Sequence, residues 1–408
     1  MEETKSQFMN KEVENLINQL ISNLNINKYT VEVAPATIRG DNFLGVVDKV
    51  LVKSEKSTLH WILKCATQIE QFRQICSIPH LFQREVYIYE NVLMEFKHFQ
   101  SEKVITDPFK SYAPYYGSLL HPPHECVVME DMKELGYKVL DRREPLDYNH
   151  ILLVTKEYAR FHAISFALRD QKPTLFEEIT KHTQCVLFNK ADKYFVELIN
   201  GYIDKALVVI DPIVNKSAYD KCLNFKKHSV EIIKNVKKLQ ATDKYSVICH
   251  SDSWINNFLF KYSNPSEPNT PSDLCIIDWQ LAHIGSPVSD LTYLLFTCTD
   301  KEFRDTHYNY VINYYYNTFS TFLRRLGSDP EELFPFSILQ EHLKAFSVFA
   351  FYMSLQVLYL MLSNTDEIPD YVNERQLLKA HYTSKNIDTY RSRMRGVVLD
   401  FDRFGYEL

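Results

Sequence analysis

Two short motifs within residues 246–280 constrain this chain more than any other part of it. An apolar run, Val247–Cys249, ends in His250-Ser251-Asp252, and Asn257 follows five positions after that aspartate. A second apolar run ends in Asp278, 21 positions after Asn257. Both carboxylates stand where a buried strand is expected to pass into a loop, so a rigid backbone can aim an exposed side chain. A lone His-x-Asp is common by chance, but the two motifs in this order are not.

This set of polar residues is the set that phosphoryl transfer from ATP requires. One aspartate orients the attacking hydroxyl and accepts its proton, while an asparagine and a second aspartate bind Mg²⁺ on the phosphates. Carboxylate and amide oxygens are the ligands that this hard cation prefers. The sequence therefore predicts Asp252 as the catalytic residue, Asn257 and Asp278 as the metal ligands, and ATP and Mg²⁺ as the cofactors.

The first third of the chain predicts an antiparallel sheet with a helix packed on it. Apolar residues recur at helical spacing over residues 11–24, and three strands are expected over 29–38, 45–53 and 58–66. A hairpin over residues 113–132 adds two further strands. We therefore expect a small sheet that precedes the catalytic stretch in the chain.

Lys64, in the third of these strands, is the candidate phosphate-binding residue. Alternation along the strand puts it on the opposite face from Leu63, and a lysine in an apolar strand needs a charge partner. A helix expected over residues 80–96 offers Glu85, and in kinases such a glutamate orients the lysine on the α- and β-phosphates. The alternative is an edge-strand lysine exposed to solvent. The catalytic pair downstream, in the right order, favours the functional interpretation.

Two further segments are candidates for nucleotide contacts. Between the first two strands, Gly40 and Gly45 flank a polar tip that contains Asn42, and glycines let backbone N–H groups approach phosphates. The strand that ends at Met129 runs into Glu130 and Met132, where the two lobes of a kinase join and backbone groups meet adenine. Each pattern alone is also typical of ordinary turns and strand ends.

From about residue 146 the pattern becomes helical, and residues 301–408 are helical and rich in aromatic residues. We interpret His162 as a buried structural residue, and Asp290 as either a helix cap or a side chain that holds the backbone of the catalytic loop. The predicted fold class is α+β and bilobal, protein-kinase-like, with a small N-terminal lobe (residues 1–131) and a large, mainly helical C-terminal lobe (residues 132–408).

Composition indicates which kinds of partner and which cellular compartment to expect for this chain. A net charge of −6 gives no reason to expect a nucleic-acid partner. The most apolar window, residues 346–362, contains polar residues, is short for a bilayer span, and predicts a buried helix. The N-terminus shows no apolar signal segment, and the eight cysteines, without a C-x-x-C pair, are typical of buried thiols in a reducing compartment. We therefore expect a cytoplasmic protein; the oligomeric state is not predicted.

The motifs resemble those of a known family. The run His250–Asn257 resembles the His-Gly-Asp-x-Trp-x-x-Asn element of the ecdysteroid kinase-like family, which belongs to the aminoglycoside phosphotransferase and choline kinase group. Asp278-Trp279-Gln280 is similar to the family's Asp-Phe-Gln. Other matching elements follow in family order: Gly40–Phe43, Lys64, Phe82-x-x-Glu85-x-x-x-Tyr89, Val128–Met132, Ala159–Ala163 and Pro287-x-x-Asp290-Leu291.

The resemblance implies a bilobal kinase-like fold and ATP-dependent phosphorylation of a hydroxyl on a small molecule, an ecdysteroid or a hydroxylated xenobiotic. Two residues depart from the family pattern, because Ser251 replaces a glycine and Trp279 replaces a phenylalanine. Neither change removes a metal ligand, so we expect an active enzyme.

Three alternatives stay open at this point. A protein kinase is disfavoured, because Trp254 stands where those enzymes have a lysine and no Ala-Pro-Glu follows. A choline- or ethanolamine-like kinase would need an aromatic or acidic cage, for which Tyr314, Tyr315, Tyr316 and Tyr352 are candidates. A catalytically weak scaffold that binds a lipophilic ligand is the third. The apolar window at 346–362 favours a bulky lipophilic alcohol as the acceptor.

Overall fold

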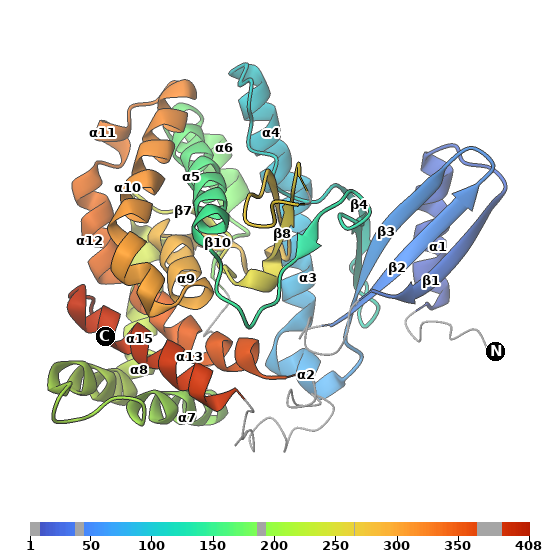
Figure 1. Cartoon of the computed structure of the whole chain (residues 1–408). Coiled ribbons are helices and arrows are strands. Elements are labelled where there is room, and N and C mark those ends of the chain that lie inside the picture. The colour runs from blue at the N-terminus through green and yellow to red at the C-terminus, as the bar shows by residue number, and fades with distance from the viewer. Residues whose placement is uncertain (1–8, 37–44, 186–192, 265, 365–385) are drawn as a thin grey trace.

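A computed structural model describes residues 9–36, 45–185, 193–264, 266–364 and 386–408 (Figure 1). A five-stranded antiparallel sheet and a mostly helical remainder form two lobes, which confirms the predicted α+β, bilobal class. The sheet order is β1-β2-β3-β5-β4. Its strands are β1 (Tyr29–Pro35), β2 (Gly45–Ser54), β3 (Thr58–Ala66), β4 (Tyr115–Leu119) and β5 (Cys126–Glu130). The lobe boundary after residue 131 stays a prediction.

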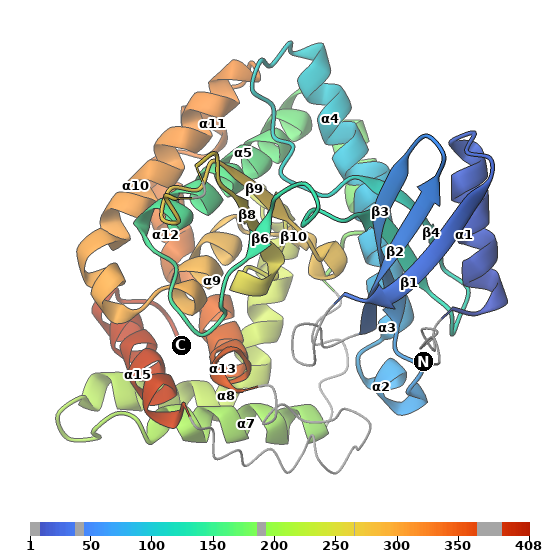
Figure 2. The ribbon, with the colours of Figure 1, turned by 45° about the vertical axis from the view of Figure 1, so that its right-hand side comes forward.

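Helix α1 (Lys11–Asn23) packs on the sheet as the periodicity predicted (Figure 2). Its first turn is capped by Asn10, whose side chain accepts hydrogen bonds from the N–H groups of Glu12 and Val13. Buried residues at helical spacing then meet the side chains of the central strands. These contacts form one apolar cluster that includes Val13, Ile17, Ile21, Val50, Val52, Trp61, Leu63 and Val128. The helix therefore covers one face of the small sheet.

The helix expected over residues 80–96 is longer and interrupted. Helix α3 (Ile78–Tyr87) passes into a π-helical turn at Ile88–Val92 and then into α4 (Leu93–Glu102). A π turn adds a residue to one turn, and an apolar repeat in the sequence does not reveal it. Helix α3 carries Glu85 and packs against the turn Trp279–Leu281 that follows the second motif. The short α2 (Glu70–Ile75) precedes it.

In the C-terminal lobe, α5 (Tyr148–Gln171) packs against α10 (Lys301–Arg325) and α9 (Val288–Cys298), and the helix predicted over 148–168 is thereby confirmed. The other helices are α6 (Pro173–Thr180), α7 (Lys193–Leu207), α8 (Lys216–Thr242), α11 (Pro330–Leu333), α12 (Phe336–Phe346), α13 (Val348–Leu362) and α15 (Ile387–Arg403). Figures 1 and 2 show α7, α8 and α15 together at one end of this lobe.

Two small sheets hold the catalytic stretch among these helices. One pairs β7 (Val247–Cys249) with β10 (His283–Gly285). The other has the order β6-β8-β9, with β6 (Lys138–Val139), β8 (Phe258–Lys261) and β9 (Asp273–Ile276). Strands β8 and β9 pair as an antiparallel hairpin. Each motif therefore follows a short buried strand.

The apolar window at residues 346–362 is a buried helix, as predicted, because nearly every residue of α13 lies in the core. In the described part of the chain, no single helix is long and apolar enough to cross a membrane. One pair of helices, Pro330–Phe346 and Val348–Leu362, meets that test only when taken together, and it is bent by 50°.

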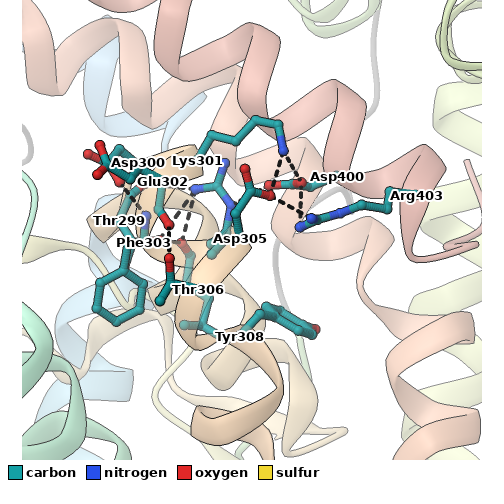
Figure 3. A network of polar contacts seen from close by, with 12 residues as sticks. Thr299, Asp300, Lys301, Glu302, Phe303, Asp305, Thr306, Tyr308, Asp400 and Arg403 are labelled. Atoms are coloured by element: carbon teal, nitrogen blue, oxygen red, sulfur yellow. Dashed lines mark hydrogen bonds and ion pairs between the residues drawn. The ribbon is translucent and has the colours of Figure 1, made fainter.

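A buried ion pair joins α10 to α15 (Figure 3). The Nε atom of Arg304 donates to an Asp400 oxygen at 2.7 Å, and Nη1 donates to the carbonyl of Thr299 at 2.8 Å. Both charged side chains are fully buried. Lys301 and Arg403 also reach Asp400, at 3.2 and 2.8 Å. Asp400 is thus the anion that compensates a guanidinium removed from water.

Asp400→Ala should destabilise the protein by about 3–5 kcal/mol, because it leaves Arg304 buried without its carboxylate. Urea unfolding measures the loss. The matched control is Asp305→Ala, since Asp305 pairs with Lys301 and Arg403 at the surface and should contribute at most about 1 kcal/mol. Equal losses for the two variants would contradict this account of the network.

Candidate active site

Lys64 joins the two lobes through its ammonium group. Its Nζ atom lies 2.7 Å from a Glu85 oxygen and 2.7 Å from an Asp278 oxygen. Burial of Lys64 disfavours its charged form, but Asp278 and Glu85 outweigh that effect and raise the pKa of Lys64. The ammonium is therefore charged at any physiological pH, and the strand lysine predicted to bind phosphates already holds two carboxylates.

The second motif is anchored to the first through the backbone. The N–H of Ile277 donates to the carbonyl of Asn257 at 3.0 Å, and the ring Nε2 of His250 lies 2.9 Å from the carbonyl of Ile277. Asp278 follows in a left-handed backbone conformation, with φ of 65°. Trp279, fully buried, packs its ring edge-on against His250. Two motifs that are separate in the sequence therefore form one rigid unit.

Asp252 is held on both of its carboxylate oxygens. The side-chain amide of Asn257 donates to Oδ2 at 2.9 Å, and the hydroxyl of Tyr293 donates to Oδ1 at 3.1 Å. Burial, and next the nearby charge of Asp278, raise the pKa of Asp252 to about 7, although both hydrogen bonds act in the opposite direction. A carboxyl group with a pKa near neutrality is suited to general base catalysis.

Asp290 holds the backbone of the catalytic loop. Its two oxygens accept hydrogen bonds from the N–H groups of His250 and Ser251, both at 2.7 Å. The ring of His162 lies 3.1 Å from the same carboxylate and the Tyr315 hydroxyl 2.8 Å from the other ring nitrogen, so His162 is a buried structural residue. Of the two roles expected for Asp290, the structure therefore shows the hold on the loop backbone.

The donor set around Asn257 and Asp278 fits Mg²⁺. The amide nitrogen of Asn257 is committed to Asp252, which leaves the amide oxygen for a cation. The Asp278 carboxylate is partly exposed, with 20% of the side chain accessible, so it is open to a ligand on one side. Two oxygen donors on adjoining loops match the preference of a hard cation that keeps several waters.

The residues expected to contact the rest of the nucleotide are only partly in view. Gly40 and Asn42 lie outside the described residues. The side chain of Glu130 accepts a hydrogen bond from Tyr116, and its N–H donates to the carbonyl of Pro114 at 2.9 Å. Met132 is buried in a cluster that spans both lobes, with members such as Ala66, Phe82, Leu259 and Cys275. An adenine contact at Glu130 or Met132 stays a prediction.

The sequence model of the ecdysteroid kinase-like family matches residues 39–328, most of the chain. The chain belongs to the ecdysteroid kinase-like family. The matched segment contains Lys64, Asp252, Asn257 and Asp278, and membership supports an enzyme of the small-molecule kinase type.

No curated protein sequence matches the chain. Among solved structures, the match to an ethanolamine kinase from Plasmodium vivax covers 99% of this chain and 98% of that kinase, at 13% identity and a TM-score of 0.43. The GDP complex of an aminoglycoside 2′-phosphotransferase covers 90% of this chain and 93% of its own, at 12% identity and a TM-score of 0.43.

Ser251, which replaces the glycine of the ecdysteroid kinase-like family, occupies a position that favours glycine. Its φ is 67°, in the left-handed region, and its buried hydroxyl has no hydrogen-bond partner in the described part of the chain. Asp290 stabilises this strained backbone, because its carboxylate accepts a hydrogen bond from the N–H of Ser251. Trp279, the other departure, replaces a smaller ring and is accommodated in the core.

Tyr293 is the site residue that the sequence did not single out. Its helix, α9, is apolar and fully buried, so a tyrosine within it reads as a core residue. The available signal was spacing, because Tyr293 follows Asp290 by three positions and therefore lies on the same face of the helix. Gln280 was noted only as part of a motif, without a role, and its side-chain oxygen lies 3.5 Å from the Nζ atom of Lys64.

Asp252→Asn should raise the melting temperature, Tm, of the metal-free protein at about pH 8 and less so at about pH 5. The folded pKa of about 7 lies above that of an unfolded aspartate, so the wild type loses stability as pH rises toward 7. An asparagine carries no such penalty, and the gain should be on the order of 2 °C. Thermal melts with a chelator present measure it.

The matched control is Asp305→Asn, because the Lys301 hydrogen bond lowers the pKa of that exposed carboxyl. This variant should gain no stability at high pH. If the difference in Tm between Asp252→Asn and the wild type does not change with pH, the pKa of the buried Asp252 carboxyl is not raised, and this account of Asp252 is wrong.

Proposed function

We propose that this protein is an ATP- and Mg²⁺-dependent kinase that transfers the γ-phosphate to a hydroxyl of a small lipophilic alcohol, such as an ecdysteroid or a hydroxylated xenobiotic. One observation carries the proposal. The carboxylate of Asp252 is fixed by Asn257 beside Asp278, and Asp278 in turn contacts Lys64. General base, metal ligands and phosphate-binding cation are therefore parts of one connected site.

Asp252 is the residue that acts on the acceptor. In its ionised form it accepts the proton of the attacking hydroxyl, and its two fixed oxygens each keep a lone pair for that hydroxyl. Because the carboxylate does not need to reorganise, the site lowers the barrier chiefly by positioning.

Lys64 and Glu85 are the residues proposed to bind the nucleotide phosphates and to orient the binding group. Lys64 would bind phosphate oxygens, and Glu85, 2.7 Å from its Nζ atom, would keep the ammonium oriented toward them. Mg²⁺, held by Asn257 and Asp278, would neutralise charge on the phosphates when bound. We also propose that Gly40 and Asn42, which lie outside the described residues, contact the phosphates, and that Glu130 and Met132 contact the adenine.

Gly45 begins β2, directly after the segment 37–44 that lies outside the described residues. A Cβ atom at this position would lie 2.2 Å from the carbonyl oxygen of Cys65, so only glycine fits where β2 approaches β3. Cys65 is the neighbour of Lys64, and Gly45 therefore lies next to the strand segment that carries the proposed phosphate-binding lysine.

Membership of the ecdysteroid kinase-like family supports a lipophilic acceptor. Helix α13, which has no charged residue, packs against α9, and the Phe349 ring lies 6.3 Å from the ring of Tyr293. Because nearly all of its side chains are buried, α13 forms the apolar core behind Tyr293 and not an exposed wall of the acceptor site.

A choline- or ethanolamine-like acceptor is less well supported. Tyr315, one of the residues considered for a cationic cage, is fully buried and hydrogen-bonded to His162. Tyr316 is directed to Glu331 instead. Adjacent helical residues point in different directions, so these two rings do not form one face.

The hydrogen bonds and ion pairs already formed at Asp252 and Lys64 favour an enzyme over a catalytically weak scaffold. The cytoplasmic location stays a prediction.

Phosphoryl transfer to a panel of a polyhydroxylated ecdysteroid, choline and a generic protein substrate tests the proposal. We expect labelled phosphate from ATP on the steroid with Mg²⁺ present, and a loss of about 10²–10⁴-fold in kcat for Asp252→Asn. Asp402→Asn, a change of the same kind in α15 where the side chain pairs with Lys221, is the control. Label on choline alone, or full activity of Asp252→Asn, would overturn the assignment.

A further inference from the structure

One face of helix α9 is directed at the catalytic loop. Asp290 accepts from the backbone of His250 and Ser251, Tyr293 donates to the side chain of Asp252, and Thr297 lies 3.4 Å from the carbonyl of Ser253. The positions 290, 293 and 297 are three and four residues apart, which is the spacing of a single helix face. The helix thus holds the loop at successive residues, from 250 to 253.

The hydroxyl of Tyr293 makes one hydrogen bond among the described residues. Its side chain is fully buried, and a buried phenol hydroxyl needs a hydrogen-bond partner inside the protein. Asp252 is that partner, at 3.1 Å. Burial also raises the pKa of Tyr293 further above its usual value, so the hydroxyl stays a donor across the range of an enzyme assay.

The two donors to Asp252 act on different oxygens and come from different elements. Asn257 belongs to the catalytic loop itself and also donates to the backbone carbonyl of Asp252 at 2.9 Å, so its amide moves with the loop. Tyr293 belongs to α9, which is fixed in the core. A carboxylate held at one oxygen rotates about the bond to its Cβ atom, whereas a second hold at the other oxygen stops that rotation.

We propose that Tyr293 is a positioning residue that fixes the plane of the catalytic carboxylate against the acceptor hydroxyl. This role rests on the proposed function of Asp252 as the general base. Tyr293 does not contact the nucleotide-binding residues Lys64 and Glu85 through any hydrogen bond of the described residues, so its contribution belongs to the transfer step and not to nucleotide binding.

Tyr293→Phe tests the role, because it removes only the hydroxyl. Loss of a hydrogen bond to a charged group should lower kcat by about 10- to 100-fold, with the KM for ATP unchanged. The matched control is Tyr308→Phe, since Tyr308 is also a buried tyrosine whose hydroxyl is hydrogen-bonded, to Tyr406. The control should keep the kcat of the wild type.

A double-mutant cycle separates positioning from general damage to the fold. If Tyr293 acts through Asp252, Tyr293→Phe should cost nothing further in an Asp252→Ala background, where no carboxylate is left to position. An equal further loss in that background, or a rise in the KM for ATP, would overturn the positioning role.

The two proposals fail in different ways. If the wild type transfers phosphate and Tyr293→Phe matches it in kcat, the positioning role is wrong and the kinase assignment stands. If the wild type neither transfers phosphate to the panel nor hydrolyses ATP with Mg²⁺, the proposed function is wrong and the role of Tyr293 falls with it.

Discussion

The site depends on one buried carboxylate that takes no part in the chemistry. Asp290 accepts from two consecutive backbone N–H groups, those of His250 and Ser251, and so fixes the turn from which Asp252 projects. Although burial opposes its ionisation, the His162 and backbone hydrogen bonds lower the pKa of Asp290. A charged, fully buried carboxylate holds a strained turn more strongly than a neutral residue does, because hydrogen bonds to an ionised acceptor are stronger. That hold explains how a serine persists at a left-handed position.

The second constraint is the balance of charge around Lys64. One ammonium lies between two carboxylates, Glu85 from the N-terminal lobe and Asp278 from the C-terminal lobe. The partly exposed Asp278 keeps a side open to a divalent cation. The two carboxylates also explain why a buried lysine is stable here, since they replace the hydration that burial removes. Nucleotide and metal would therefore complete an arrangement that is already largely formed.

Much of the fold could be predicted from the sequence, because regular spacing of apolar residues marks the helices and strands that bury one face. The strand expected over 58–66 is found as Thr58–Ala66, and α1 buries the predicted face. The π turn at Ile88–Val92 could not be predicted, since one extra residue in a turn leaves no trace in an apolar repeat. Tyr293 was missed for a related reason, because an apolar helix conceals a polar contact made by a single hydroxyl.

Asp278 and Asn257 are proposed to bind Mg²⁺ on a nucleotide, and calorimetric binding of ATP with and without Mg²⁺ tests this role most directly. We expect Mg²⁺ to strengthen ATP binding to the wild type, and Asp278→Asn to abolish that gain. Asp273→Asn, at the start of the strand that precedes Asp278 and hydrogen-bonded to Tyr137, should keep it. ATP binding that is indifferent to Mg²⁺ in the wild type, or an undiminished gain in Asp278→Asn, would contradict the account.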